Sequence, residues 1–468
     1  MPKVTPTREA YKLLNDGSIA LSRVEEAGMR IDEDLLDQKW KKIERKISKL
    51  TTKLQEDKLF KPWKKMFQDK ANLGSRPQLA KVLIAEGLLK QITVKEIQTS
   101  KGNKKHNIKM DEDALSKIDH PFVRDYVHLE KLKKAKGTYL TGIKREIVNG
   151  YIHPIFNLHI PTTYRGSAEM PNAQNIPRRV EEMARLVREC FIPRKNHVLI
   201  EMDFKGVEVT VSACYHKDPV MIEYILDKSK DMHRDMAAEC YACRVKDVTK
   251  PMRDMAKNQF VFPEFYGSYF QQCAPDLWES ILRFNLQLAD GTLVGDHLES
   301  KGIHERGSCS PDERPKQGTF EYHLKQVEEK FWGKRFKAYA AWKEKWWQDY
   351  VKKGYVQYYT GFIVSGLNKR NEILNYPIQG AAFHCLLWCL IKMVKWLIKH
   401  KMKSVVIAQI HDSMLLDVHK KELEDVLAHA KYLMTEAIMK HWPWLIVPLE
   451  VESEIGEKNW YDKRAIEL

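Results

Sequence analysis

The fold is decided by the stretch VVIAQIHDSMLLDV, residues 405–418. Two apolar runs of strand length, 405–410 and 414–418, flank a polar His-Asp-Ser. Short apolar runs around a polar turn are typical of a buried β-hairpin. The pattern therefore predicts a hairpin in the core of the protein, with Asp412 at its tip.

A second buried strand is predicted at VLIEMD, residues 198–203, which ends in Asp203. If this strand neighbours the hairpin in one sheet, the carboxylates of Asp203 and Asp412 lie in one site. A carboxylate pair suits Mg²⁺, and two such ions can assist attack on a phosphate. Acids at strand ends are common, so this pair alone is a weak signal. Strands interleaved with helices predict an α+β fold.

A group of cationic and aromatic residues lies between these strands in the sequence. Arg253 and Lys257 are four residues apart, so they share one face of a helix. Such a face can grip a triphosphate, and His233 lies twenty residues before Arg253. The aromatic residues that follow Lys257 offer stacking surfaces for a base, although core packing is the simpler interpretation.

The chain of 468 residues carries a formal net charge of +15, from 78 basic and 63 acidic residues. This excess fits a polyanionic partner such as nucleic acid, and it also fits a protein with a basic surface. Lysines are dense in the helical pattern of residues 41–70 and again at 131–136. They form either a solvated helix face or a basic arm that lies along a phosphate backbone.

No apolar run is long enough to predict a membrane span. The most apolar helical stretch, 381–398, is interrupted by a histidine and two lysines, which favours a buried helix. A signal-peptide pattern is missing from the first residues, so a cytoplasmic location is expected, the host cytoplasm if the protein is viral. The eight cysteines are expected to be reduced structural thiols. Residues 286–318, rich in Gly and Pro, predict an insertion.

Three separated motifs resemble those of family A DNA polymerases, the polymerase I family. Residues 200–208, IEMDFKGVE, resemble motif A, which typically reads D-Y-S-Q-I-E. Residues 409–412, QIHD, resemble motif C. The matches to motif B are Arg253, Lys257, Tyr266 and Gly267. Further similar stretches are NAQNIP at 172–177, NYPIQG at 375–380 and, where the thumb opens, SRVEEAGMRID at 22–32.

This resemblance implies a right-hand polymerase fold, with an antiparallel-sheet palm and a mainly helical thumb and fingers. The implied ranges are a helical, basic thumb at 1–150, palm at 151–230 with motif A and at 351–468 with motif C, and fingers at 231–350 with motif B and the insertion near 286–318. The implied activity is template-directed DNA synthesis. Deoxynucleotides are added to a primer 3′ end by two-metal-ion nucleotidyl transfer, which releases pyrophosphate.

The resemblance also implies a role for particular residues. Asp203 and Asp412 would be the catalytic acids and would bind two Mg²⁺ ions together with the backbone carbonyl of Phe204. Glu208 would exclude the ribose 2′-hydroxyl. The dNTP would be bound by His233, Arg253, Lys257, Phe262 and Tyr266. The primer–template would be contacted by Arg165, Asn172, Gln174, Asn175, Asn375, Gln379 and His411.

The sequence departs from the family pattern at three places. Lys205 and Gly206 stand in motif A where Ser and Gln are common. Ser413 stands where the family usually has Glu, which is expected to affect activity only slightly. From Lys257 to Tyr266 is nine residues instead of the usual eight, and Pro263 is expected to kink the helix. The aromatic that stacks on the base falls at Phe262 when counted back from Tyr266, and at Val261 when counted forward from Lys257. Phe262 is favoured because stacking needs a flat face.

The implied partners are primer–template DNA and dNTPs, with no membrane. The chain begins close to the thumb, so no proofreading exonuclease is expected in it. Either it is a naturally short, virus-like polymerase, with any exonuclease or replication accessory protein on a separate chain, or it is a trimmed piece of a longer protein. These features resemble phage members of the family. The alternatives are a single-subunit RNA polymerase or reverse transcriptase, and a catalytically inactive primer–template binding protein. Glu208 favours deoxynucleotides, and the two aspartates favour an active enzyme.

Overall fold

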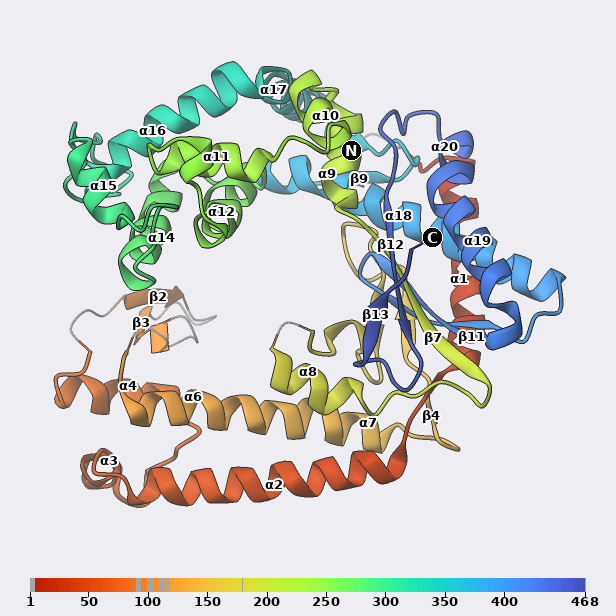
Figure 1. The fold of residues 1–468 in the computed structure, drawn as a ribbon, viewed down its shortest axis with the longest axis horizontal. Coiled ribbons are helices and arrows are strands. Elements are labelled where there is room, and N and C mark those ends of the chain that lie inside the picture. The colour runs from red at the N-terminus through yellow and green to blue at the C-terminus, as the bar shows by residue number, and fades with distance from the viewer. Residues whose placement is uncertain are drawn as a thin grey trace.

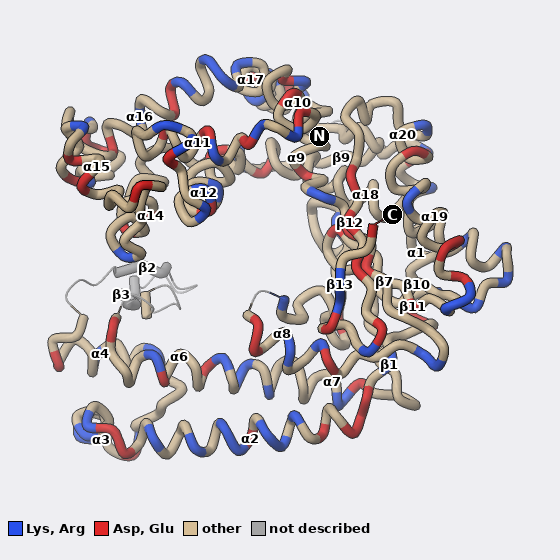
Figure 2. The backbone as a smooth tube through the Cα atoms, viewed as in Figure 1, with Lys and Arg blue, Asp and Glu red and all other residues tan. Residues whose placement is uncertain are grey.

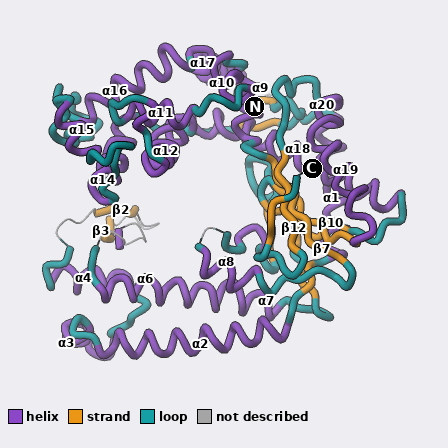
Figure 3. The backbone as a smooth tube through the Cα atoms, in the orientation of Figure 1, coloured by secondary structure: helices purple, strands orange, loops and turns teal. Residues whose placement is uncertain are grey.

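The computed structural model of the chain describes residues 5–89, 94–98, 104–108, 114–115, 118–178 and 180–467. Its elements form three groups (Figure 1): a sheet at the right of the view, called the central sheet, a helical arm that runs to the left along the bottom and a helical arch that runs to the left along the top. The four longest strands lie in the central sheet, whereas the arm and the arch are largely helical (Figure 3). The α+β class predicted from the sequence is confirmed.

The central sheet has five antiparallel strands in the order β10-β11-β7-β12-β13. The strands are β7 (His197–Phe204), β10 (Val405–Ile410), β11 (Ser413–His419), β12 (Val451–Gly456) and β13 (Lys463–Ala465). The hairpin predicted at 405–418 is therefore confirmed as β10 and β11, and the strand predicted at 198–203 is confirmed as β7. The two predicted strands are direct neighbours, because β11 pairs with β7 along its whole length.

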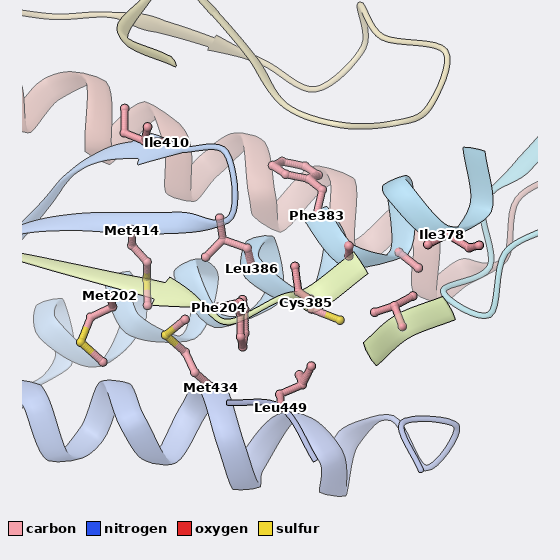
Figure 4. Close-up of a cluster of buried hydrophobic side chains, with 14 of the residues drawn as sticks. Met202, Phe204, Ile378, Phe383, Cys385, Leu386, Ile410, Met414, Met434 and Leu449 are labelled. Atoms are coloured by element: carbon pink, nitrogen blue, oxygen red, sulfur yellow. The ribbon is translucent and has the colours of Figure 1, made fainter. Parts of the chain in front are cut away.

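One face of the sheet is covered by helices and the other carries the acids. Successive side chains of a strand point to opposite faces. Met202 and Phe204 of β7 point to the covered face, where they join a buried cluster with residues of α18 (Arg370–Lys399), as Figure 4 shows. Glu201 and Asp203 therefore point to the opposite face.

The helix α18 forms the centre of the core. It is the one helix in the described part of the chain that is long and apolar enough to cross a membrane, and 78% of its apolar window is buried inside the protein. That burial is what a core helix shows. A Cβ at Gly380 would lie 2.3 Å from the backbone oxygen of Thr163, so the small residue lets the chain at 163–166 approach the helix closely.

The first helix, α1 (Arg8–Ala27), packs against α18 and β10. Its Glu9 Oε1 accepts a hydrogen bond from Trp442 Nε1 at 2.7 Å, and its Asp16 pairs with Lys395 at 2.7 Å. The range 1–150 expected for the thumb therefore contains one helix that lies outside the arm. Helices α19 (Leu423–Tyr432) and α20 (Ile438–His441) follow the hairpin.

The helical arm has a small core of its own, centred on the fully buried Trp63, Phe122 and Tyr126. Its helices are α2 (Glu33–Glu56), α3 (Phe60–Phe67), α4 (Arg76–Ala85), α6 (Pro121–Lys134) and α7 (Thr141–Arg145), with a π segment, η2 (Ala135–Leu140), between the last two. Lysine and arginine recur along α2 and α6 (Figure 2). The arm is therefore a basic unit with its own small core, and Leu36, Leu132 and Ile143 join it to the main core.

The helical arch runs from the end of β7 to the second half of the sheet. Its helices are α9 (Val207–His216), α10 (Pro219–Leu226), α11 (Met232–Cys240), α12 (Lys250–Ala256), α13 (Phe262–Phe265), α14 (Phe270–Arg283), α15 (Val294–Ser300), α16 (Phe320–Lys330) and α17 (Lys337–Lys353). The predicted insertion at 286–318 contains α15 and lies at the far end of the arch, between α14 and α16 (Figure 1).

The remaining elements are short. They are α8 (Glu181–Arg188), the strand pairs β1 (Met29–Arg30) with β4 (Tyr151–Ile152), β2 (Val94–Gln98) with β3 (Lys104–Ile108), β5 (Ile155–Asn157) with β6 (Ser167–Glu169), and β8 (Tyr355–Gln357) with β9 (Ile363–Ser365). All eight cysteines lie in the described part of the chain as free thiols. Burial raises the pKa of Cys240, Cys385 and Cys389 well above the ordinary value, so these thiols are unreactive packing residues.

Candidate active site

The two predicted catalytic acids lie at the same end of the sheet. Ser413, the first residue of β11, pairs with Asp203 of β7, so the tip of the hairpin lies beside the end of β7. The backbone N–H of Phe204 donates a hydrogen bond to the backbone oxygen of Asp412, with 3.2 Å from N to O. His411 takes a left-handed conformation at the tip, with φ of 54°. The structure therefore brings Asp203, Phe204 and Asp412 together.

The electrostatics of these carboxyl groups suit a cation. Burial raises the pKa of Asp412 to about 6, and the nearby carboxylates of Glu208 and Asp203 add to the increase. Burial also raises the pKa of Asp203, against the effect of Arg178, whose Nη1 lies 3.5 Å from Asp203 Oδ2. Neighbouring acids that resist ionising together are stabilised by a bound cation. Two carboxylates and a backbone carbonyl form an all-oxygen donor set, which fits Mg²⁺.

Glu208 links the sheet to the arch. It lies in the first turn of α9 and forms an ion pair with Arg165. Its Oε2 accepts a hydrogen bond from the hydroxyl of Tyr266, with 2.7 Å between the two oxygen atoms. Because Glu208 also acts on the pKa of Asp412, the acids of the sheet and the aromatic residue of the arch belong to one site.

The predicted nucleotide-binding residues of the arch lie together. The rings of His233 and Phe262 meet edge to face at 5.6 Å between centroids, and Lys257 Nζ lies 5.2 Å from the centroid of Phe262. Burial, followed by the charges of Lys257 and Arg253, lowers the pKa of His233 to about 4. His233 is therefore neutral at pH 7, and its buried Nδ1 has no hydrogen-bond partner in the described part of the chain.

Arg253 is held by a partner that sequence analysis missed. Its Nε donates a hydrogen bond to Asp231 Oδ2 at 2.6 Å. The other oxygen of Asp231 accepts a hydrogen bond from the backbone N–H of Arg234 and caps α11. Asp231 therefore fixes Arg253 to the start of the helix that carries His233. The one sequence feature that could have pointed to Asp231 is its position two residues before the predicted site residue His233.

The extra residue of motif B is absorbed by a π segment. Residues Lys257–Val261 form η5, a turn of π-helix between α12 and α13. A π turn takes up one more residue than an α turn, so the residues after it keep their direction. Val261 is 0% exposed, whereas Phe262 is half-buried beside Lys257. This arrangement supports Phe262, and not Val261, as the stacking position.

Pro263 falls directly after the π segment. It is the second residue of α13, in the first turn, where the missing N–H matters least. The break that the proline was expected to cause therefore coincides with the change from π-helix to α-helix. The chain turns away after Tyr266, at Gly267, which has φ of 90°.

The residues expected at the primer–template fall into three groups. Gln174 Nε2 donates a hydrogen bond to Gln409 Oε1 at 2.5 Å, and Gln409 Nε2 donates to the backbone oxygen of His411 at 2.5 Å. These residues join the 172–177 segment to the hairpin tip. Asn172 Oδ1 accepts from the backbone N–H of Asn175 and caps the short helix η3 (Ala173–Asn175), while its contact with the primer–template stays a prediction.

The third group belongs to α18. Asn375 Nδ2 donates a hydrogen bond to the backbone oxygen of Tyr266 at 3.2 Å. Gln379 lies one turn further along the same helix and is partly exposed. The N-terminal end of α18 is thus tied to the end of motif B. Gln409 of motif C, which joins Gln174 to the hairpin tip, is a further member of the first group that the predicted site left out.

A buried ionic group beneath Asp203 was also missed. Glu201 is nearly fully buried, pairs with Lys463 and accepts a hydrogen bond from Trp460 Nε1 at 2.8 Å. The hydroxyl of Ser413 lies 3.3 Å from Glu201 Oε1. Ser413, which replaces the usual Glu, therefore lies against a carboxylate supplied by the neighbouring strand. The C-terminal segment gave no sequence signal for this contact.

A sheet with two acids at one end, flanked by a basic helical arm and a helical arch that carries cations and aromatic residues, is the arrangement of the right-hand polymerase fold. The sheet is its palm, the arm its thumb and the arch its fingers. The chain matches the family model described as DNA polymerase family A over residues 35–279 and 326–462. The chain belongs to this family. The segment between the two matched ranges contains the insertion predicted at 286–318.

Similar proteins include cellular and phage polymerases. The chain is 27% identical over 465 residues to DNA polymerase I of Caldicellulosiruptor bescii. This match covers 95% of this chain and 46% of that protein. It is 26% identical over 424 residues to a DNA polymerase of Bacillus phage SP01, and this match covers 84% of this chain and 40% of the phage protein. The chain spans about half the length of the curated relatives that it matches.

The fold is also similar to a solved structure, the POL domain of Pol1 from M. smegmatis in a complex with DNA primer-template and dNTP. The TM-score is 0.72 and the sequence identity 22%, with 96% of this chain and 70% of that chain covered. This likeness supports the right-hand fold.

Proposed function

We propose that this protein is a DNA-directed DNA polymerase that adds deoxynucleotides to a primer 3′ end and releases pyrophosphate. One observation carries the proposal. Asp203 and Asp412 meet at one end of the palm sheet and are connected through Glu208 to Tyr266 of the fingers. The proposed assignment takes 151–230 and 351–468 as palm, 231–350 as fingers and the arm within 1–150 as thumb.

The palm residues would act on the reacting groups. Asp203, Asp412 and the carbonyl of Phe204 would hold two Mg²⁺ ions, which when bound neutralise charge on the phosphates and activate the primer 3′-hydroxyl. Glu208, fixed by its bonds to Arg165 and Tyr266, would fill the space that a ribose 2′-hydroxyl needs. Its position favours deoxynucleotides over the RNA polymerase alternative.

The fingers residues would bind the nucleotide. Arg253 and Lys257 would bind the triphosphate as cations, and the neutral His233 would donate a hydrogen bond to it. Phe262 would stack on the base, and Tyr266 would lie near the templating base. Catalysis then depends mainly on positioning and on charge stabilisation.

The primer–template would lie between thumb and palm. Arg165, Gln174 and His411 lie around the acids and would contact the primer end, joined by Asn175, Asn375 and Gln379. The basic helices α2 and α6 would bind the phosphate backbone without reading sequence. This part of the affinity should fall steeply with salt, because counterions compete for the phosphates.

The direct test is extension of a primed DNA template. Addition of Mg²⁺ and dNTPs should extend the primer, while rNTPs or excess chelator should give little or no product. Efficient extension with rNTPs would favour an RNA polymerase, and tight primer–template binding without extension under any condition would favour a binding protein.

The choice between Phe262 and Val261 can be measured. Phe262→Ala should raise the KM for dNTP by about tenfold or more, because a stacking contact is worth roughly 1–3 kcal/mol. Val261→Ala should leave that KM nearly unchanged and lower the free energy of unfolding by about 2 kcal/mol, because it removes buried methyl groups. A larger change in KM for Val261→Ala than for Phe262→Ala would contradict the assignment of the stacking role to Phe262.

A further inference from the structure

A buried acid lies beside Asp203 on the acid-bearing face of the palm sheet. Glu201 is 2% exposed and comes two residues before Asp203 in β7, so both side chains point to the same face. Two such positions in a strand are about 6.6 Å apart. Glu201 and Asp203 also line one cavity of about 840 Å³, together with Arg178 and acids of β12. Acidic side chains are rarely buried without partners, so Glu201 needs partners inside the protein.

The partners of Glu201 come from the C-terminal segment. Trp460 Nε1 donates a hydrogen bond to Glu201 Oε2 at 2.8 Å, and the ammonium group of Lys463 forms an ion pair with the same oxygen. Lys463 Nζ also lies 2.6 Å from Oε2 of Glu454, which pairs directly with Glu201 across β12 and β7. Burial acts to raise the pKa of Glu201, but the charge of Lys463 and the two donors outweigh it and keep that pKa below its ordinary value. Glu201 is therefore a carboxylate at pH 7.

Trp460 is itself held firmly in place. Its ring meets that of Phe191 edge to face at 5.4 Å between centroids, and its backbone N–H donates to the backbone oxygen of Phe191 at 2.9 Å. The guanidinium carbon of Arg188 lies 4.0 Å from the centroid of the Trp460 ring. Arg188 Nε donates to the backbone oxygen of Pro177 at 2.8 Å, so this cation is directed at the chain and not at Glu201. The indole therefore fixes the orientation of Glu201.

The other oxygen of Glu201 faces the tip of the hairpin. The hydroxyl of Ser413 lies 3.3 Å from Glu201 Oε1, and its single proton also has the backbone oxygen of Ile410 at 2.9 Å. Oε1 therefore only shares a donor, at the end of the sheet where Asp203 and Asp412 meet. Ser413 is 2% exposed, so a glutamate at this position would bring two carboxylates together in a buried space. Glu201 and an acid at 413 exclude each other.

We propose that Glu201 supplies, from β7, the negative charge that the family pattern places at position 413, and that it is a positioning residue for the cations at Asp203 and Asp412. This inference rests on the proposed function. Glu201 is not a ligand in this proposal: its charge attracts the cations through space, and the charge of Lys463 reduces that attraction. Loss of the charge of Glu201 should weaken cation binding by about three- to tenfold, because a unit charge acts on a divalent ion across a partly screened distance.

The test compares two variants that break the same ion pair but change its charge in opposite directions. Mn²⁺ binding is measured by electron paramagnetic resonance of the free ion, on the full chain with a dNTP and a dideoxy-terminated primer–template. Asp203→Asn gives the baseline for ions bound by DNA and nucleotide. Glu201→Gln should weaken Mn²⁺ binding by about three- to tenfold, whereas Lys463→Gln should not weaken it and the double variant should be close to the parent. The matched control is Glu457→Gln, an exposed acid of the same segment, which should bind as the parent does.

The outcomes separate this proposal from a purely structural ion pair and from the proposed function. Equal weakening by Glu201→Gln and Lys463→Gln would mean that the pair acts only through the fold, and would overturn the proposal. If Glu201→Gln does not fold, the double variant is compared with Lys463→Gln: it should bind Mn²⁺ more weakly, and equal affinity would contradict the proposal. If the parent binds no more Mn²⁺ than Asp203→Asn, the proposed function itself fails. Parental binding above that baseline, with Glu201→Gln equal to the parent, would overturn this inference alone.

Discussion

Asp203→Asn and Asp412→Asn should each lower the rate of primer extension by about 10³-fold or more while primer–template binding is kept. The amide has the size of the carboxyl group but lacks the charge that a divalent cation requires. The charge of Asp203 adds to the raised pKa of Asp412, so the two carboxylates lie close together and either change removes one negative charge from the site. The measurement is single-turnover extension with saturating dNTP, together with DNA affinity at fixed salt.

The control for this pair is Asp425→Asn, an exposed acid in α19. It changes the net charge by the same amount and should leave extension unchanged. DNA affinity of the two active-site variants should be equal to that of the parent or higher, because a negative charge near the DNA phosphates is removed. Extension by either active-site variant within about tenfold of the parental rate would place the chemistry elsewhere.

Lys257→Ala should lower kcat/KM for dNTP by about 10²–10³-fold, the usual loss when one group that stabilises developing charge is removed. The ammonium lies beside Phe262, between the proposed base-stacking surface and the residues expected to bind phosphate. Its removal should also raise the pKa of His233, because the charge of Lys257 is the second cause of the lowered value. The measurement is a pre-steady-state dNTP titration, with melting temperature as a check on folding.

Two further variants sharpen this result. Lys257→Arg should keep part of the activity, because a cation remains, although the guanidinium has a different shape and reach. Lys250→Ala, at the exposed start of the same α12 helix, should have little effect. A loss in Lys250→Ala equal to that in Lys257→Ala would indicate a general effect of positive charge instead of a specific contact with the triphosphate.

The sequence predicts three of the five strands of the central sheet, because these strands are short, apolar and bounded by polar residues, whereas β12 and β13 were not predicted. The hairpin at 405–418 and the strand at 198–203 both form where the pattern places them. Periodicity alone does not decide that they are neighbours. That conclusion depended on the resemblance of Asp203 and Asp412 to motifs A and C, and the register of β11 with β7 bears it out.

The parts that sequence analysis missed depend on contacts between distant positions. Glu201 and Trp460 are 259 residues apart, and Glu201 and Lys463 are 262 residues apart. No local pattern marks such pairs. Likewise, α1 has the periodicity of any amphipathic helix, and its place against α18 and not in the arm is decided by tertiary packing.

The choice between Phe262 and Val261 shows the same limit within one helix. The two counts differ by one residue, and only burial distinguishes them. Val261 is buried in the core of the fingers. The extra residue is accommodated by the π turn at 257–261, which places Phe262 outside that core. A sequence analysis that assumes 3.6 residues per turn does not predict a π turn, which has more residues per turn.

The π turn also bears on how such chains change length during evolution. One inserted residue in an α-helix would rotate everything after it by about 100°. Here the insertion is confined to a single wide turn, and Phe262, directly after that turn, still lies beside Lys257 at its start. An insertion or deletion can therefore be inherited inside a helix as well as in a loop. An alignment that allows gaps only between helices would misplace every residue from Phe262 to Tyr266.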